Sequence, residues 1–148
     1  MKIITDNKKA KFDYSFVETY EAGIELRGSE VKSARNNQVQ LKDSYVAFSG
    51  NEAFLMKAHI AEYKSSSYNN HEPERKRKLL LHREELEKIR GKIEQGGLTC
   101  IPTKMYFKDG MIKLEIAIAR GKKKDDKRED IKKRDVNREI AARLRRSK

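Results

Sequence analysis

The sequence predicts a mainly β fold, a small antiparallel β-barrel with helices inserted between its strands. Several short segments alternate apolar and polar side chains, as strands do when one face covers a core. Two pairs of these segments are joined by short loops that contain glycine, which is typical of antiparallel hairpins. Short strands of this kind favour a closed or partly open barrel over a parallel α/β sheet.

The first half of the chain contains three predicted strands, after a short basic entry at residues 7–11. Aromatic and polar residues alternate over residues 12–20, and this strand continues past a break at Gly23 into residues 24–26. Residues 39–48 and 52–56 flank a Ser-Gly-Asn loop and form the first hairpin.

Two helices are expected between the strands. Ser29 can cap a short helix that runs to about Asn36, with Val31, Ala34 and Arg35 on its inner side. A long polar loop at residues 64–77 ends in a basic cluster. A second helix is then expected at residues 79–94 and ends at two glycines. The apolar side of this second helix would consist of Leu79, Leu80, Leu86, Ile89 and Ile93.

The last hairpin leads directly into a highly charged tail. Residues 98–107 and 111–119 form two strands joined by Asp109-Gly110. After Gly121 the chain has 13 Lys or Arg and 6 Asp or Glu, a net charge of +7 out of +12 for the whole chain. The sequence therefore divides into a barrel at residues 1–120 and a basic tail at residues 121–148.

The tail is expected to be a conditional helix. A helix beginning near Glu129 would place Val136, Ile140 and Leu144 on one stripe. So few aliphatic side chains bury too little surface to offset the entropy of ordering. We therefore expect the tail to be mostly disordered when free and helical on a polyanion, and a solvated helix or solubilising tail is the alternative.

Composition points to nucleic acid as the partner. A pI near 9.8 with clustered Lys and Arg favours nucleic acid over an anionic membrane, and the chain has no apolar run long enough to span a bilayer. The N-terminus has no signal-peptide core and Cys100 is the single cysteine, so we expect a cytoplasmic chain without a disulfide.

No catalytic or metal-binding motif stands out. His59, His71 and His82 are scattered, and no Cys or carboxylate lies at ligand spacing, so we expect surface or packing histidines, no metal, no cofactor and no enzyme activity. A nuclease is a weakly supported rival, because the acidic residues are interleaved with basic ones as on a solvated surface.

Basic residues beside aromatic ones suggest an RNA-binding domain. Arg75, Arg77 and Lys78 come just before the predicted second helix, where they can reach phosphates. Tyr14 can stack on a base, whereas Tyr20 and Tyr106 are better explained as edges of the core.

Six dispersed motifs resemble the SsrA-binding protein family, the partners of transfer-messenger RNA. They occur in order over nearly the whole chain, as Asn-Lys-Lys-Ala at residues 7–10, Tyr-Glu-Ala-Gly-Ile at 20–24, Glu-Val-Lys-Ser at 30–33, Leu-Lys-Asp-Ser-Tyr at 41–45, Arg-Lys-Leu-Leu-Leu at 77–81 and Arg-Gly-Lys-Lys-Lys at 120–124. Asp-Lys-Arg follows at residues 126–128.

The resemblance implies an oligonucleotide-binding (OB)-type barrel with about three peripheral helices and a basic tail. It also implies an adaptor, monomeric when free, that binds the tRNA-like domain of transfer-messenger RNA and delivers it to stalled ribosomes for trans-translation. The tail would occupy the empty decoding centre and messenger channel. The alternative is a structural ribosomal protein or a general RNA chaperone.

The family's RNA-contacting positions correspond here to Asn7, Tyr14, Glu21, Leu80 and Lys113. In the tail, the resemblance assigns ribosome binding to Lys122, Lys123, Lys124, Asp126, Lys127 and Arg128, with Ile140 and Leu144 on the helix stripe. Two departures matter. Asp125 stands where many members have a histidine or aromatic residue, so stacking there is not carried over, and neither are contacts from Glu74 and Lys76.

Overall fold

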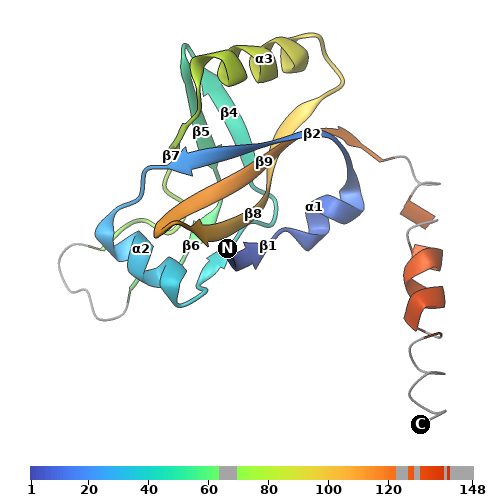
Figure 1. Cartoon of the computed structure of the whole chain (residues 1–148), viewed down its shortest axis with the longest axis horizontal. Coiled ribbons are helices and arrows are strands. Elements are labelled where there is room, and N and C mark those ends of the chain that lie inside the picture. The colour runs from blue at the N-terminus through green and yellow to red at the C-terminus, as the bar shows by residue number, and fades with distance from the viewer. Residues whose placement is uncertain (64–69, 123–126, 129–130, 139, 141–148) are drawn as a thin grey trace.

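The computed structural model describes residues 1–63, 70–122, 127–128, 131–138 and 140. Its main feature is a seven-stranded antiparallel sheet in the order β1-β8-β9-β2-β7-β5-β4 (Figure 1). These strands are β1 (Lys2–Asp6), β2 (Tyr14–Ile24), β4 (Tyr45–Ser49), β5 (Glu52–Met56), β7 (Arg77–Leu80), β8 (Thr99–Lys108) and β9 (Met111–Gly121). A separate pair consists of β3 (Val39–Gln40) and β6 (His59–Ile60).

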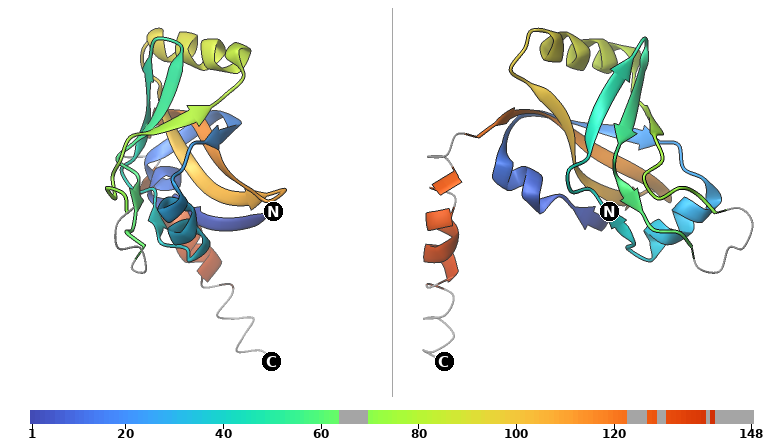
Figure 2. Two further views of the ribbon diagram at one scale, coloured as in Figure 1. Left: turned by 90° about the vertical axis from the view of Figure 1, so that its left-hand side faces the viewer. Right: turned by 180° about the vertical axis from the view of Figure 1, so that it is seen from behind.

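The sheet curls into a partly closed barrel. β4 lies at one edge of the sheet and contacts β8, which is next to the other edge (Figure 2). Leu114, Ile116 and Ile118 of β9 are fully buried, while Lys113 and Glu115 alternate with them on the outer face. The prediction of a mainly β antiparallel fold is therefore confirmed, because one face of each long strand covers a shared apolar core.

Both predicted hairpin turns are present, but the predicted strand at residues 39–48 is divided, because residues 39–40 form β3 and pair with β6, and β4 begins only at Tyr45. β4 pairs with β5 and β8 pairs with β9. Asp109 and Gly110 have φ of 52° and 76°, the left-handed values that a tight hairpin turn requires. Local turn chemistry therefore predicted these two connections correctly.

The N-terminal region differs from the prediction. β1 pairs with β8, and a short helix, α1 (Lys8–Asp13), precedes β2 and includes the first two residues of the predicted strand, Phe12 and Asp13. β2 then runs without interruption through Gly23, because Gly23 pairs with Leu80 on one side and with Lys113 on the other.

The second helix, α2 (Gly28–Arg35), has a different inner face from the one predicted. It begins before Ser29, and its buried residues are Ser29, Glu30, Ser33 and Ala34 rather than Val31 and Arg35. The reason is the Glu30 carboxylate, which is fully buried against basic residues of a distant segment.

The third helix, α3 (Arg83–Glu94), is shorter than predicted. Leu79 and Leu80 belong to β7, where Leu79 pairs with Ile24 and Ala53 and is buried, whereas Leu80 is exposed. The apolar residues Leu79 and Leu80 fit the start of a helix when only the local sequence is considered. Because β7 pairs with β2 on one side and with β5 on the other, they form a strand instead. α3 lies across one end of the barrel (Figure 1).

Residues 127–128, 131–138 and 140 of the tail are helical, and Lys127 is the residue among them that pairs with α1, through Asp13. Ile131, Val136 and Ile140 are exposed, so these three side chains are not packed into a core. The low helix content expected for the free tail in solution stays a prediction.

Candidate nucleic-acid interface

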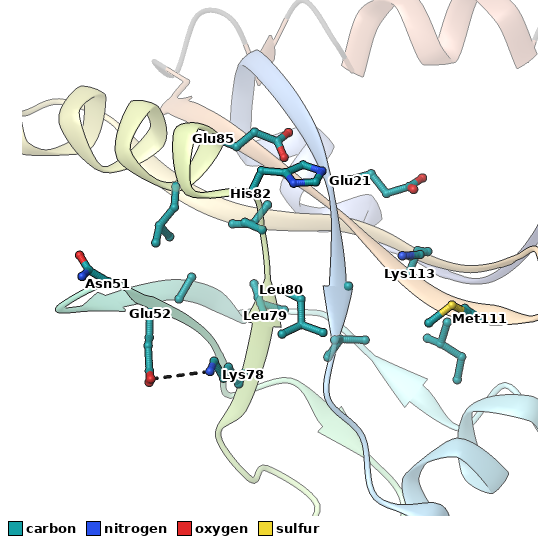
Figure 3. Close-up of a pocket in the computed structure, with 16 residues that line it drawn as sticks. Glu21, Asn51, Glu52, Lys78, Leu79, Leu80, His82, Glu85, Met111 and Lys113 are labelled. Atoms are coloured by element: carbon teal, nitrogen blue, oxygen red, sulfur yellow. Dashed lines mark ion pairs between the residues drawn. The ribbon is translucent and has the colours of Figure 1, made fainter.

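A hollow of about 530 Å³ lies between β2, β5, β7, β9 and the start of α3 (Figure 3). Four of the predicted RNA-contacting residues line it, namely Glu21, Lys78, Leu80 and Lys113. They come from three segments that are far apart in the sequence, and the order β9-β2-β7 makes those segments neighbours. These four residues bring two ammonium groups, one carboxylate and an apolar side chain to the hollow, and Glu52 and Glu85 add two further carboxylates to its lining.

The strand register explains why Leu80 is accessible. Leu80, Gly23 and Lys113 are partners in one row across β7, β2 and β9. Gly23 has no side chain, and a Cβ built there would lie 3.1 Å from the Cβ of Leu80. Because glycine lets Leu80 approach the strand this closely, Leu80 covers Gly23 and still remains 49% exposed.

Glu21 is an ionised acceptor held in place by two neighbours. Its Oε2 accepts a 2.6 Å hydrogen bond from Tyr106 Oη and a 3.2 Å charged hydrogen bond from Lys108 Nζ. These hydrogen bonds, with the charge of nearby Lys113, hold the pKa of Glu21 below its usual range. The carboxylate therefore offers only acceptor positions, which suit a base amine or imino group.

Lys78 is the member of the basic cluster that lines the hollow. Its ammonium lies 3.6 Å from Glu52, and both side chains are partly exposed (Figure 3). An ion pair this exposed is weak and can be exchanged for a phosphate. Lys78 therefore lies on the wall of the hollow with an ammonium that solvent can reach, and its contact with RNA stays a prediction.

Arg77 corrects the prediction for this cluster. Its side chain is completely buried, where it pairs with Glu30 and donates to Ala58 O at 2.8 Å and Pro73 O at 2.9 Å. With no exposed surface, Arg77 cannot contact RNA in this conformation.

Arg75 is also engaged, by a 2.6 Å ion pair with Glu30, and its side chain is 24% exposed. Hydrogen bonds from Arg75, the Arg27 backbone and Arg77 outweigh burial and lower the pKa of Glu30. Lys76, whose contacts were not carried over, places its ammonium 3.9 Å from the ring centre of Phe54. Arg75 and Arg77 therefore support the fold.

Asn7 and Tyr14 lie elsewhere, lining a second hollow of about 310 Å³ beside α1. Asn7 is buried; its amide donates to Pro102 O at 2.8 Å, and its Oδ1 accepts from Ala10 N at the start of α1. The prediction that Asn7 contacts RNA is not supported, because both polar atoms are used within the fold. Tyr14 remains partly accessible.

The first residues of the tail are attached to α1. Lys122 donates from its backbone to Asp13 O at 2.9 Å and from Nζ to Lys11 O at 3.1 Å. Lys127 pairs with the Asp13 carboxylate at 3.2 Å and lies 5.7 Å from the Phe12 ring centre. Arg128 and Ile140 are exposed. Four predicted tail residues, Lys123, Lys124, Asp126 and Leu144, lie outside the described residues, as does Asp125.

The described residues were also compared with the requirements of a metal site, a reactive side chain and a membrane-spanning helix. Among the described residues no three His, Cys, Asp or Glu side chains are grouped to hold a metal ion. His71 is buried between Ser29 Oγ and Ile60 O, at 2.8 Å from each, and burial raises the pKa of Cys100 to about 12. No helix in the described part of the chain is long and apolar enough to cross a membrane.

Sequence reasoning missed Tyr106 and Lys108 as part of the hollow's surroundings. Tyr106 was assigned to a core edge, and it is indeed only 4% exposed, but its hydroxyl reaches Glu21. The period of two in β8 does place Tyr106 and Lys108 on one face. That they meet Glu21, two strands away, requires the order β8-β9-β2.

Comparisons with known proteins agree with one another. A family model described as SmpB protein matches residues 4–146. The SsrA-binding protein of Bdellovibrio bacteriovorus is 62% identical over 146 residues, which cover 99% of this chain and 96% of that protein. The SsrA-binding protein of Thermosipho melanesiensis is 57% identical, with 95% and 96% covered. A solved structure described as "tmRNA-SmpB: a journey to the center of the bacterial ribosome" aligns with a TM-score of 0.69 and 45% identity, over 86% of this chain and 93% of that chain.

Proposed function

Because the chain belongs to the SmpB, or SsrA-binding protein, family, we propose that it is a non-enzymatic adaptor that binds the tRNA-like domain of transfer-messenger RNA. In this proposal the barrel, residues 1–120, grips the RNA and delivers it to stalled ribosomes for trans-translation. The cytoplasm is the compartment in which both partners would be met.

The observation that carries the proposal is the convergence of Glu21, Leu80 and Lys113 in one hollow. Lys113 and Lys78 can neutralise phosphates, which position an RNA without reading its sequence. Leu80 and Met111, exposed by 49% and 60%, offer an apolar surface to a base or ribose. Glu21 supplies the selective contact, since a carboxylate accepts from the N–H groups of a base edge and is repelled by phosphates.

This arrangement suits a folded RNA with accessible loop bases better than a regular duplex. The deep and narrow major groove of an RNA duplex keeps most base edges away from side chains, whereas unstacked loop bases expose them. A tRNA-like domain has such loops. Glu21 would then select a particular loop, while the two lysines hold the backbone on either side of it.

The tail, residues 121–148, has a separate role in the proposal. Its net charge of +7 suits a channel walled by ribosomal RNA. We assign the contact near the empty decoding centre to Asp126, Lys127 and Arg128, supported by Lys122, Lys123 and Lys124. Ile140 and Leu144 would gain a surface to pack against when the tail becomes helical in the messenger channel.

Binding of a fluorescent tRNA-like fragment tests the barrel's role. We expect Leu80→Ala to weaken binding, and Lys113→Ala to weaken it and to reduce the slope of log affinity against log salt by about one unit. Lys32→Ala is the matched control, because it removes a lysine from the exposed side of α2, outside the hollow. Unchanged affinity in both hollow variants would refute the proposed interface.

Sequencing the RNA that co-purifies with the tagged chain separates the proposal from its alternative. Enrichment of transfer-messenger RNA supports an adaptor. Recovery of ribosomal RNA alone would instead indicate a structural ribosomal protein or a general RNA chaperone.

A further inference from the structure

The carboxylate of Glu21 is more tightly held than a surface glutamate usually is. Tyr106 Oη donates to its Oε2 at 2.6 Å, and Lys108 Nζ lies 3.2 Å from Oε2 and 3.5 Å from Oε1. Both partners come from β8, which is not next to β2 in the sheet, since β9 lies between them. The Tyr106 side chain therefore extends over β9 to reach Glu21.

We propose that Tyr106 and Lys108 are positioning residues for RNA recognition, which fix Glu21 so that its Oε1 accepts an N–H from an RNA base. This inference rests on the proposed contact between Glu21 and RNA. Tyr106 and Lys108 themselves need not touch the RNA.

Tyr106 is suited to this role because it is rigid. It is 4% exposed, and in the sheet it is the direct partner of Ile3 on one side and of Lys113 on the other. Burial and the hydrogen bond to Glu21 raise the pKa of Tyr106, so its hydroxyl remains a donor. A buried ring with one fixed donor restricts the glutamate, which otherwise samples many rotamers in solution.

The two carboxylate oxygens of Glu21 differ in how many hydrogen bonds they already accept. Each oxygen of a carboxylate can accept about two hydrogen bonds. Oε2 already accepts from both Tyr106 and Lys108, whereas Oε1 has only the 3.5 Å contact with Lys108, at the limit of a hydrogen bond. Oε1 is therefore the oxygen with capacity for an incoming donor, and Glu21 enters the complex already oriented.

Lys113 belongs to the same arrangement. It is the register partner of both Tyr106 and Gly23, so it lies in the row beside Glu21, and its charge acts on that carboxylate. Tyr106 thus fixes a base acceptor on the same face of the sheet as a phosphate-neutralising ammonium. A preorganised pair loses less entropy on binding than two independent side chains.

The chain provides a matched control for removing the Tyr106 hydroxyl. Tyr20 on β2 also donates its hydroxyl to a glutamate, Glu18, at 2.5 Å. Glu18 is paired with Lys92 of α3, and neither residue lines the hollow. Tyr106→Phe and Tyr20→Phe therefore delete equivalent hydrogen bonds, one inside the proposed interface and one outside it.

The test is a double-mutant cycle on affinity for the tRNA-like RNA fragment, measured on the full chain. Tyr106→Phe should weaken binding on the order of fivefold to tenfold, because a hydrogen bond to a charged group is lost and Glu21 regains rotamer freedom. Tyr20→Phe should change the affinity by less than about twofold. In a Glu21→Gln background, Tyr106→Phe should have little further effect, because the group it positions has been changed.

The outcomes separate this inference from the function on which it rests. If Glu21→Gln weakens binding but Tyr106→Phe does not, the positioning role is wrong and the RNA interface stands. If Tyr106→Phe lowered the RNA affinity equally in the parent and in the Glu21→Gln background, Tyr106 would act independently of Glu21. That result would also overturn the inference. If Glu21→Gln binds like the parent, the proposed base contact itself fails.

Thermal unfolding separates positioning from a purely structural role. If the Tyr106 hydrogen bond served only to hold β8 against β2, its loss would lower the thermal stability and would have no effect on RNA binding that depends on Glu21. Should Tyr106→Phe fail to fold, Lys108→Met replaces it in the same cycle, since methionine keeps an unbranched apolar stem and lacks the ammonium. Loss of affinity from Lys108→Met that persists in the Glu21→Gln background would contradict the proposal.

Discussion

Replacing Arg77 with Met should unfold the barrel more readily without removing an RNA contact. The guanidinium is fully buried and binds the Glu30 carboxylate and the carbonyls of Ala58 and Pro73. Methionine matches the aliphatic stem of arginine but lacks the guanidinium, so both carbonyls lose a buried partner. Glu30 would keep only its contacts with Arg75 and the Arg27 backbone.

The expected loss follows from these contacts. Breaking a buried, hydrogen-bonded ion pair from one side costs about 3–5 kcal/mol, because the remaining partner stays desolvated. For a domain of this size, about 1 kcal/mol corresponds to roughly 3–5 °C in Tm, so Arg77→Met should lower Tm by about 10–20 °C. Circular dichroism during heating measures this shift.

The neighbouring residue Lys78 provides the control. It is partly exposed and paired with Glu52 at 3.6 Å, so Lys78→Met should cost less than about 1 kcal/mol of stability. Its RNA affinity should fall, whereas Arg77→Met should bind normally at a temperature at which it is folded. A small Tm change together with weak RNA binding in Arg77→Met would show that Arg77 turns outward to RNA.

Three further predictions concern the tail and pH. A chain truncated after Lys122 keeps the backbone bond to Asp13 and should retain most of its RNA affinity while failing to support tagging of stalled peptides; loss of RNA binding would refute the division between barrel and tail. Ile140→Pro should abolish tagging if the bound tail is helical, since proline in a helix interior costs roughly 3 kcal/mol; normal tagging would favour an extended polycation. The pKa of Glu30 is lowered in the folded chain, so its stabilising effect is full above the unfolded value near 4.5 and is lost as pH falls through the lowered value. Chemical unfolding at several pH values should therefore show that the difference in free energy of unfolding between the parent and Glu30→Gln becomes smaller as the pH falls. A difference that stays constant with pH would contradict the lowered pKa of Glu30.

Elements with local sequence signals were predicted well. The β8–β9 hairpin is specified by alternating residues on either side of Asp109-Gly110, and both turn residues adopt the positive φ that this dipeptide tolerates. The core face of β9 likewise follows from a period of two. Such features depend on neighbours in sequence, so a single chain segment contains the information.

Elements stabilised by distant segments were not predicted. Leu79 and Leu80 fitted a helix start until pairing with β2 and β5 made them a strand. Arg77 resembled a surface cation in its basic cluster, yet it fills the core because Glu30 from α2 neutralises it there. In both cases a contact between residues far apart in sequence outweighed the local preference.

The sequence by itself determined the mainly β fold, the two hairpins, the charged tail and the family resemblance, since each depends on composition or on patterns along the chain. Only the tertiary structure decided which of the predicted residues share a surface. Glu21, Leu80 and Lys113 meet because β9, β2 and β7 are adjacent, while Asn7 is buried elsewhere. Strand order and burial are set by long-range packing, and hydrogen bonding across the sheet then decides which polar groups are left free to bind RNA.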